Sequence, residues 1–360
     1  MAQFETKVVK ITITPHDNAD TLEIAQVGGY KSIVLKGLYK TGDLAAYIQE
    51  GSIVPDDIIE ELGLTGRLAG SKANRVKALR LRGVFSQGLL YPARPHWNEG
   101  DDVKDELNIV KYVPEVPVEL QGEAFALPYE HTFHFDIDDI KKHPHILEEG
   151  EEVILTEKLH GTFCAVTAVP DAERNDADYF KGRVFVASKG CVERGYAFKT
   201  TNENAYNKQV QEDGLIDIAI LLSDRFKTTV RILGELFGCG IQDLHYGFTS
   251  KGQTAFRVFA ICMGDRNEPT YLGDYALDLV LEELGMKRVP KLYRGPFSQA
   301  VLEKYTSGKE SFSGKETNMR EGVVVTLAVE RKADGLPGNR VILKSVSPEY
   351  LTRKGGTEYS

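Results

Sequence analysis

The sequence contains little cysteine and no long apolar run. Its four cysteines, Cys164, Cys191, Cys239 and Cys262, lie far apart without paired ligand spacing. This pattern argues against a zinc site or a disulfide framework and fits a reducing compartment. No apolar stretch approaches the roughly 20 residues that cross a bilayer, and the N-terminal residues form no signal or transit segment. We therefore expect a cytoplasmic protein that makes no membrane contact.

An excess of positive charge is also absent. The formal net charge is −9, which excludes a uniformly basic nucleic-acid coat protein but permits a local basic surface. Hydrophobic residues make up 42% and charged residues 27%, which excludes a wholly disordered chain. The length of 360 residues exceeds that of an average domain, so two domains are expected.

The first hundred residues contain short β-rich runs separated by turn signals such as Gly28-Gly29 and Thr41-Gly42-Asp43. Strands are predicted at 8–14, 21–27, 32–35, 45–48 and 77–81. Several short strands without a long helix between them predict a small barrel or sandwich. Prolines then extend the chain at 113–117, as in linkers. We expect a first domain at 1–110, a linker at 111–130 and a second domain at 131–360.

The second half mixes strands with helices at irregular intervals, which predicts an α+β fold. Strands are expected at 153–156, 163–168, 183–187, 229–236, 255–263, 322–328 and 340–343. One helix is predicted to begin near Thr201-Asn202, because apolar residues recur at helical spacing as far as Phe226. Two further helices are predicted at 274–284 and 297–305.

A phosphate-binding glycine loop is missing, since there is neither a Walker sequence nor a strand-linked GxGxxG. Charged side chains must therefore contact any nucleotide. An ordered set of short motifs lies on or at the end of predicted strands: Thr156-Glu157-Lys158-Leu159-His160-Gly161, Ser188-Lys189-Gly190, Gly234-Glu235-Leu236-Phe237-Gly238, the run 256–263, Glu321-Gly322 and Leu343-Lys344. A sheet built from these strands would gather lysines, glutamates and an aromatic ring near one cleft.

This ordered set resembles the motifs of covalent nucleotidyltransferases, which include ATP-dependent ligases and capping enzymes. The resemblance assigns one role to each motif. It implies Lys158 as the nucleophile, Lys189 in the next motif, Glu235 on the ribose, Phe256 stacked on the base, Glu321 in the acidic Glu-Gly motif and Lys344 as the last lysine. Glu157, Gly161 and Arg194 are further candidates for binding the nucleotide. Arg194 would contact phosphate or the RNA end, and the alternative is a solvated arginine.

The segments 16–23, 34–44 and 77–89 look like the OB-fold domain of one RNA ligase group, in which this domain precedes the ligase domain. The implied fold is an OB-like β-barrel followed by a nucleotidyltransferase domain with antiparallel sheets and flanking helices. The implied reaction seals a 3′-OH to a 5′-phosphate at nicks in duplex RNA or RNA/DNA, with RNA on the 3′-OH side, as in RNA repair. We expect the protein to act as a monomer.

The resemblance also implies a mechanism. The neutral Lys158 amine would attack the α-phosphorus of ATP, and AMP would stay on the lysine. Because a free lysine has a pKa of about 10.4, the site must favour the neutral form. Lys344 or a bound metal would do so by like-charge repulsion, and Lys344 would also stabilise charge on the α-phosphate. Glu321 is expected to hold Mg²⁺ or Mn²⁺.

Two positions depart from the usual pattern. His160 stands two residues after the lysine, where an aspartate is most common, and Val346 replaces a second lysine in the last motif. Arg353 or Lys354 are candidates to replace that lysine. Two other functions therefore stay open, an mRNA guanylyltransferase and a non-catalytic RNA-binding relative.

A basic segment lies in the first half of the chain, where no acidic residue interrupts Lys72, Arg75, Lys77, Arg80 and Arg82. We expect these side chains to contact duplex phosphates, and the alternative is a solvated strand face.

Overall fold

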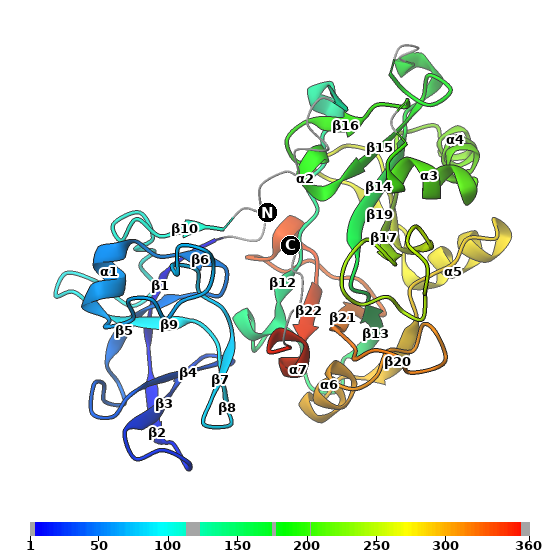
Figure 1. Ribbon diagram of the computed structural model, residues 1–360. Helices are drawn as coiled ribbons and strands as arrows, with labels where there is room; N and C mark the ends of the chain where they lie inside the picture. The colour runs from blue at the N-terminus through cyan, green and yellow to red at the C-terminus, as the bar shows by residue number, and fades with distance from the viewer. Residues whose placement is uncertain (1–3, 113–122, 175–177, 202, 354–360) are drawn as a thin grey trace.

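The computed structural model describes residues 4–112, 123–174, 178–201 and 203–353. It has the predicted α+β architecture, in which a β-rich N-terminal part lies beside a larger part of mixed structure (Figure 1). Within the described ranges no helix combines the length and apolar character needed to cross a membrane.

The N-terminal part consists of short antiparallel strands and one short helix. The strands form sheets in the orders β1-β5-β9, β2-β3-β4, β10-β6 and β7-β8. Their bounds are β1 (Lys7–Lys10), β2 (Thr12–Pro15), β3 (Leu22–Val27), β4 (Tyr30–Leu35), β5 (Leu44–Ile48), β6 (Ser52–Ile53), β7 (Leu79–Leu81), β8 (Val84–Ser86), β9 (Leu89–Pro92) and β10 (Val110–Lys111), and helix α1 is Asp56–Glu61. These strands pair with one another, which supports the proposed first domain.

The strand predicted at 8–14 is divided into β1 and β2, which belong to two different sheets. The division falls at Ile11, whose amide donates to the Asp43 carbonyl at 3.0 Å. The side chain of Ile11 is buried with Ala25 and Val27. An alternating pattern continues through such a corner, so the change of sheet was not visible in the sequence.

The larger part contains two five-stranded sheets. The first has the order β12-β22-β21-β13-β20 and the second has the order β15-β14-β17-β18-β19. The first comprises β12 (Asp138–Asp139), β13 (Glu152–Lys158), β20 (Lys291–Pro296), β21 (Gly322–Leu327) and β22 (Ile342–Val346). The second comprises β14 (Thr162–Ala168), β15 (Val184–Ser188), β17 (Val230–Gly238), β18 (Thr254–Met263) and β19 (Thr270–Tyr271). A separate pair joins β11 (Ala124–Ala126) to β16 (Tyr196–Phe198).

The helices of this part pack on one face of each sheet. Apolar residues of α3, α4 and α5 share a core with the second sheet, and α6 covers the first. The helices are α2 (Lys189–Val192), α3 (Ala205–Glu212), α4 (Leu215–Phe226), α5 (Asp274–Glu283), α6 (Gln299–Thr306) and α7 (Pro348–Leu351), with 3₁₀ turns η2 (Tyr129–His131), η3 (Ile140–Lys142), η4 (Asp171–Glu173) and η5 (Pro337–Asn339). The opposite face of the second sheet is covered in part by β11 and β16, through Phe125 and Ala197.

The helix predicted from Thr201-Asn202 to Phe226 is in fact two helices, α3 and α4. Gly214 separates them in the left-handed region, with φ of +66°, which a glycine adopts without strain. The cap is Asn204, whose side chain accepts from the Asn207 amide at 2.8 Å. The predicted Asn202 lies outside the described residues. The other two predicted helices are confirmed as α5 and α6.

Candidate active site

Strand register brings two of the predicted lysines to one face of the first sheet. Lys158 lies opposite Gly322 of β21, and two residues away Thr156 lies opposite Val324, which in turn faces Lys344 of β22. Directly opposed residues point to the same face, as do residues two apart along a strand. Lys158 and Lys344 therefore share the face that α6 does not cover.

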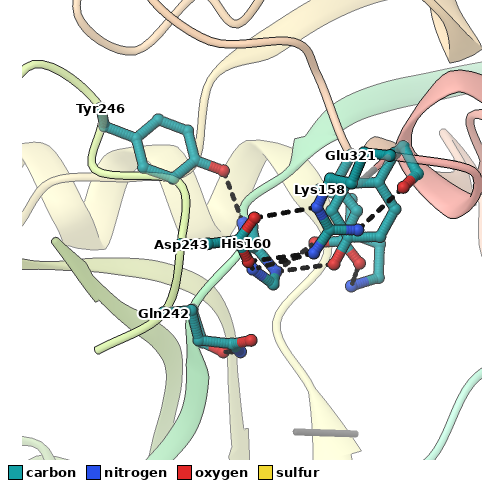
Figure 2. Close-up of polar contacts among 9 residues, drawn as sticks. Lys158, His160, Gln242, Asp243, Tyr246 and Glu321 are labelled. Atoms are coloured by element: carbon teal, nitrogen blue, oxygen red, sulfur yellow. Dashed lines mark hydrogen bonds and ion pairs between the residues drawn. The ribbon is translucent and has the colours of Figure 1, made fainter. Parts of the chain in front are cut away.

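Lys158 forms an ion pair with Glu321, which precedes β21. Its Nζ lies 2.5 Å from Glu321 Oε1 (Figure 2). The two side chains are 25% and 8% exposed. Such a charge-assisted hydrogen bond in a partly dehydrated site is stronger than one in water, so it fixes the position of the amine.

The pair determines where the proton resides. Burial opposes the shift, but the carboxylates of Glu321 and Glu235 raise the pKa of Lys158 above its usual value. Burial and then the charge on Lys158 lower the pKa of Lys344. In the ligand-free protein the nearby carboxylates stabilise the ammonium of Lys158, so the neutral amine expected beside Lys344 or a bound metal stays a prediction for the protein with ATP bound.

Glu235 enters the same site from the second sheet. Burial raises its pKa to about 8, against the opposing effect of the Lys158 charge, and its carboxyl group also accepts a hydrogen bond from the Gly161 amide. Gly161 belongs to the three-residue connection from β13 to β14, and a Cβ at this position would clash with the Leu236 carbonyl of β17. A glycine here lets the lysine-bearing turn approach the strand that carries Glu235.

Phe256 does not lie on this face. It is 4% exposed and belongs to the core between the second sheet and its helices. A bulge in the β17–β18 pairing leaves Phe259 without a direct partner, so strict alternation fails along β18. Phe259 instead meets Phe163, with ring centroids 6.1 Å apart, and Phe163 lies opposite Glu235. The predicted stacking of Phe256 on a base disagrees with this placement.

Glu157 also points away from the site. It follows Thr156 and precedes Lys158, so alternation turns it to the opposite face of β13. Its carboxylate accepts from the Ser311 amide at 2.8 Å and from the Ser311 hydroxyl at 2.5 Å. Burial raises the pKa of Glu157. The carboxylate thus anchors the segment around Ser311, and the predicted role in nucleotide binding disagrees with this position.

Lys189 begins α2, and its Nζ lies 2.9 Å from Asp136 Oδ1. Burial opposes the shift, but Lys189 and then Lys344 lower the pKa of Asp136, which links this pair electrostatically to the first sheet. Asp136 lies in a stretch without strand or helix and had no sequence signal. Arg194 is exposed on the turn after α2, and within the described ranges nothing joins it to Lys158 or Glu321.

A divalent cation fits the donor set at Glu321. Among the described residues Glu321 Oε2 is buried and accepts no hydrogen bond. No cluster of three or more histidine, cysteine or acidic side chains there would form a complete protein cage. Mg²⁺ commonly uses one or two carboxylates and takes its other ligands from water and substrate phosphates. This chain therefore offers Glu321 Oε2 as a ligand for an ion that arrives with a polyphosphate.

The two residues that depart from the usual motifs, Val346 and His160, both lie near Lys158. Gly322 of β21 lies between Lys158 of β13 and Val346 of β22, and the Val346 side chain packs against the apolar cluster that contains Leu159. His160 is buried behind Lys158 and bonded to Asp243. Arg353 approaches His160, while Lys354 lies outside the described residues. Sequence reasoning missed Asp243 because it lies in a loop without periodicity.

Family comparisons agree with this geometry. Residues 151–346, more than half of the chain, match the model described as RNA ligase. The chain belongs to the RNA ligase family. Residues 6–93 match a model described as an OB-fold domain, so the predicted fold of an OB-fold domain before a nucleotidyltransferase-type ligase domain is confirmed. The chain is thus an enzyme of the RNA ligase type. No curated protein matches the sequence.

Solved structures of Naegleria gruberi RNA ligase are similar to this ligase along nearly its whole length. A lysine-to-alanine mutant with ATP and Mn has a TM-score of 0.76 at 22% identity, over 97% of this chain and 98% of that one. The structure with PPi has a TM-score of 0.76 at 23% identity, with the same coverage of 97% and 98%. At this identity the similarity concerns the fold.

Proposed function

We propose that this ligase uses ATP to seal 3′-OH/5′-phosphate nicks in duplex RNA or RNA/DNA, and that it acts as a monomer. The observation that carries the proposal is the Lys158–Glu321 ion pair, with Lys344 on the same face and Glu235 opposite. Solved structures of similar fold contain ATP and Mn or AMP and Mn, which supports ATP as the nucleotide and a divalent cation as its companion.

In the first step Lys158 loses its proton and its amine attacks the α-phosphorus of ATP. A nitrogen–phosphorus bond forms, and pyrophosphate leaves. A divalent cation bound at Glu321 would neutralise phosphate charge and weaken the hold of this carboxylate on the lysine proton. Lys344, whose pKa is lowered, supplies a cation that becomes favourable as negative charge gathers on the phosphate.

The nucleoside part of ATP would lie between the two sheets. The carboxyl group of Glu235 is positioned for a hydrogen bond with a ribose hydroxyl. We propose that adenine contacts Phe163 and Phe259, the rings on the Glu235 side, in place of Phe256. AMP then passes to the RNA 5′-phosphate, and the 3′-OH displaces it to form the new ester bond.

The rate of lysine adenylation is expected to rise with pH. Only the neutral amine is nucleophilic, and Glu321 and Glu235 raise the pKa of Lys158 despite its burial. Below about pH 7, where the Glu235 carboxyl stays protonated, the neutral fraction increases roughly tenfold per pH unit, and the rise becomes shallower as Glu235 ionises near its pKa of about 8. Single-turnover labelling by ATP, measured at saturating Mg²⁺ from about pH 6 to about pH 8, checks this. A flat profile would show that loss of the lysine proton does not limit the step.

The basic segment is the proposed phosphate-binding surface. Arg80 lies in β7, and Arg82 follows in the turn to β8, both exposed. Arg80 also lies 3.3 Å from Glu349 of α7, which follows the last lysine motif. This exposed pair contributes little stability. It supports a path for duplex RNA from the OB-fold domain toward α7 of the ligase domain (Figure 1).

Replacing Arg80 and Arg82 together by alanine is expected to weaken binding of nicked duplex and to lower its salt dependence. Loss of two phosphate contacts on a duplex should reduce the slope of log K against log salt by about 1.8. Arg225→Ala is the control, because Arg225 is exposed on α4 and pairs with Glu283. Equal slopes for all three proteins would place the duplex elsewhere.

The sealing reaction itself tests the proposal. A nicked duplex with labelled 5′-phosphate is incubated with protein, ATP and Mg²⁺, with either ribose or deoxyribose at the 3′-OH end. We expect ligation and a transient RNA-adenylate with the ribose terminus only. Failure to join either nick, by protein that still labels itself with AMP, would refute the proposed substrate.

A further inference from the structure

His160 is a buried polar side chain that two separate segments hold in place, the loop with Asp243 and Tyr246 and the segment with Tyr350 and Arg353. It is 3% exposed. Its Nε2 lies 2.7 Å from Asp243 Oδ1, and its Nδ1 lies 2.7 Å from the Tyr350 hydroxyl (Figure 2). Its backbone amide donates to the Tyr246 hydroxyl at 2.6 Å. The ring and the backbone of this residue are therefore both fixed, one residue before Gly161 and two after Lys158.

Asp243 is held in turn by Arg353. Arg353 Nε donates to Asp243 Oδ2 at 2.9 Å, and Arg353 Nη2 donates to Oδ1 at 3.0 Å. This two-point geometry is the strong arrangement of an arginine with a carboxylate. The Arg353 side chain is 7% exposed and lies over the Tyr350 ring, 3.7 Å from its centroid. The Arg353 end of the pair is thus shielded from water, while the Asp243 side chain is 24% exposed.

The His160–Asp243–Arg353 contacts lie next to the Lys158–Glu321 ion pair. His160 Nδ1 lies 3.7 Å from Glu321 Oε2, and Glu321 Oε1 bonds Lys158. When Nε2 donates to Asp243, the Nδ1 atom of a neutral ring accepts from the Tyr350 hydroxyl, and this is the tautomer that we assign to the ring. The carboxylate of Asp243 therefore orients the imidazole that flanks Glu321, while Arg353 balances the charge of Asp243 inside the protein.

We propose that His160, Asp243 and Arg353 form one positioning unit that holds Glu321 and the Lys158 turn in the geometry for adenylation. This inference rests on the proposed function and adds residues that act through Lys158 and Glu321. Position 160 carries no aspartate, and Asp243 supplies a carboxylate 2.7 Å from the His160 ring. Arg353 supplies a cation bonded to Asp243, in a chain where Val346 stands in place of the second lysine.

Asp243→Asn tests the unit, because asparagine keeps the size of the side chain but loses its charge. We expect the adenylation rate constant at saturating ATP to fall on the order of 10- to 100-fold with little change in KM, since misplacement of reacting groups acts on the chemical step. Arg353→Lys keeps the charge but loses the two-point contact, and should fall in the same direction. Asp224→Asn, which alters an ion pair with Arg183 elsewhere, is the matched control.

A rescue separates positioning from mere stability. His160→Asp puts a second carboxylate beside Asp243 and should lower adenylation. Combining His160→Asp with Asp243→Asn restores a single negative charge next to Arg353 and should recover activity above both single variants. Thermal unfolding monitors each protein, and Arg353→Lys substitutes for any variant that does not fold.

The outcomes are distinguishable. If the unsubstituted ligase does not label itself with AMP, the proposed function fails and the unit fails with it. If it labels and Asp243→Asn or Arg353→Lys stays within about twofold of it, only the positioning unit is refuted. A double variant no more active than the better single variant would also refute the unit, because the carboxylate could then not be exchanged between positions 160 and 243.

Discussion

Lys158→Arg is expected to abolish covalent labelling by AMP while leaving the fold intact. The guanidinium retains the positive charge and a hydrogen bond to Glu321, so the ion pair that fixes this turn survives. An arginine does not deprotonate in proteins, however, and therefore supplies no nucleophile. Incubation with ATP labelled at the α-phosphate, followed by denaturing electrophoresis, measures the label, and thermal unfolding measures the fold.

The same variant separates the first step from the last. Given a nicked strand that already carries AMP on its 5′-phosphate, Lys158→Arg should still seal, because the missing step has been bypassed. Label that survives denaturation in Lys158→Arg would assign the nucleophile to another residue. Loss of sealing on the preadenylated strand would give Lys158 a second role in the final step.

Lys344→Ala is expected to lower the adenylation rate about 100- to 1000-fold, the usual loss when one cation or donor on the transition-state charge is removed. Its ammonium is disfavoured in the ligand-free protein by burial and then by Lys158, and it shares a face with that lysine. Phosphate charge that develops nearby reverses this cost, so the side chain acts more strongly in the transition state than before it. Single-turnover kinetics over a range of ATP concentrations measure the effect.

Two comparisons define the role of Lys344. Lys344→Arg should retain part of the rate, because charge survives without the point-like ammonium. Glu157→Ala is the matched control on the same sheet, because Glu157 faces away and bonds Ser311. It should lower stability by about 1–3 kcal/mol and leave the adenylation rate of folded protein unchanged. A purely KM effect in Lys344→Ala would show that Lys344 binds ATP without favouring the transition state.

Strand-borne features were the most predictable from sequence. Lys158, Glu235 and Lys344 lie on strands whose apolar pattern was clear, and Glu321 immediately precedes one; the structure brings the other three residues close to Lys158. Their chemical roles stay predictions. Glu157 could have been excluded in advance, because alternation turns it away from Lys158. Gly214 likewise carried a local signal for the break between α3 and α4.

Other features depended on tertiary structure. The bulge in β18 places Phe256 in the core and Phe259 on the side of the sheet that carries Glu235. No residue type in that strand predicts the bulge. Asp136 and Asp243 lie in loops and Tyr350 lies in a single helical turn. In such short or irregular segments the apolar pattern does not predict which way a side chain points. The proton preference of Lys158 could not be read from the sequence either, since it depends on a 2.5 Å contact between residues 163 positions apart.

Peptide mapping of the protein after incubation with ATP and Mg²⁺ tests the central claim most directly. The account predicts AMP attached to the Lys158 side chain, dependent on ATP and not formed with GTP. Attachment to a different residue, attachment of GMP in preference to AMP, or no attachment with either nucleotide would contradict it.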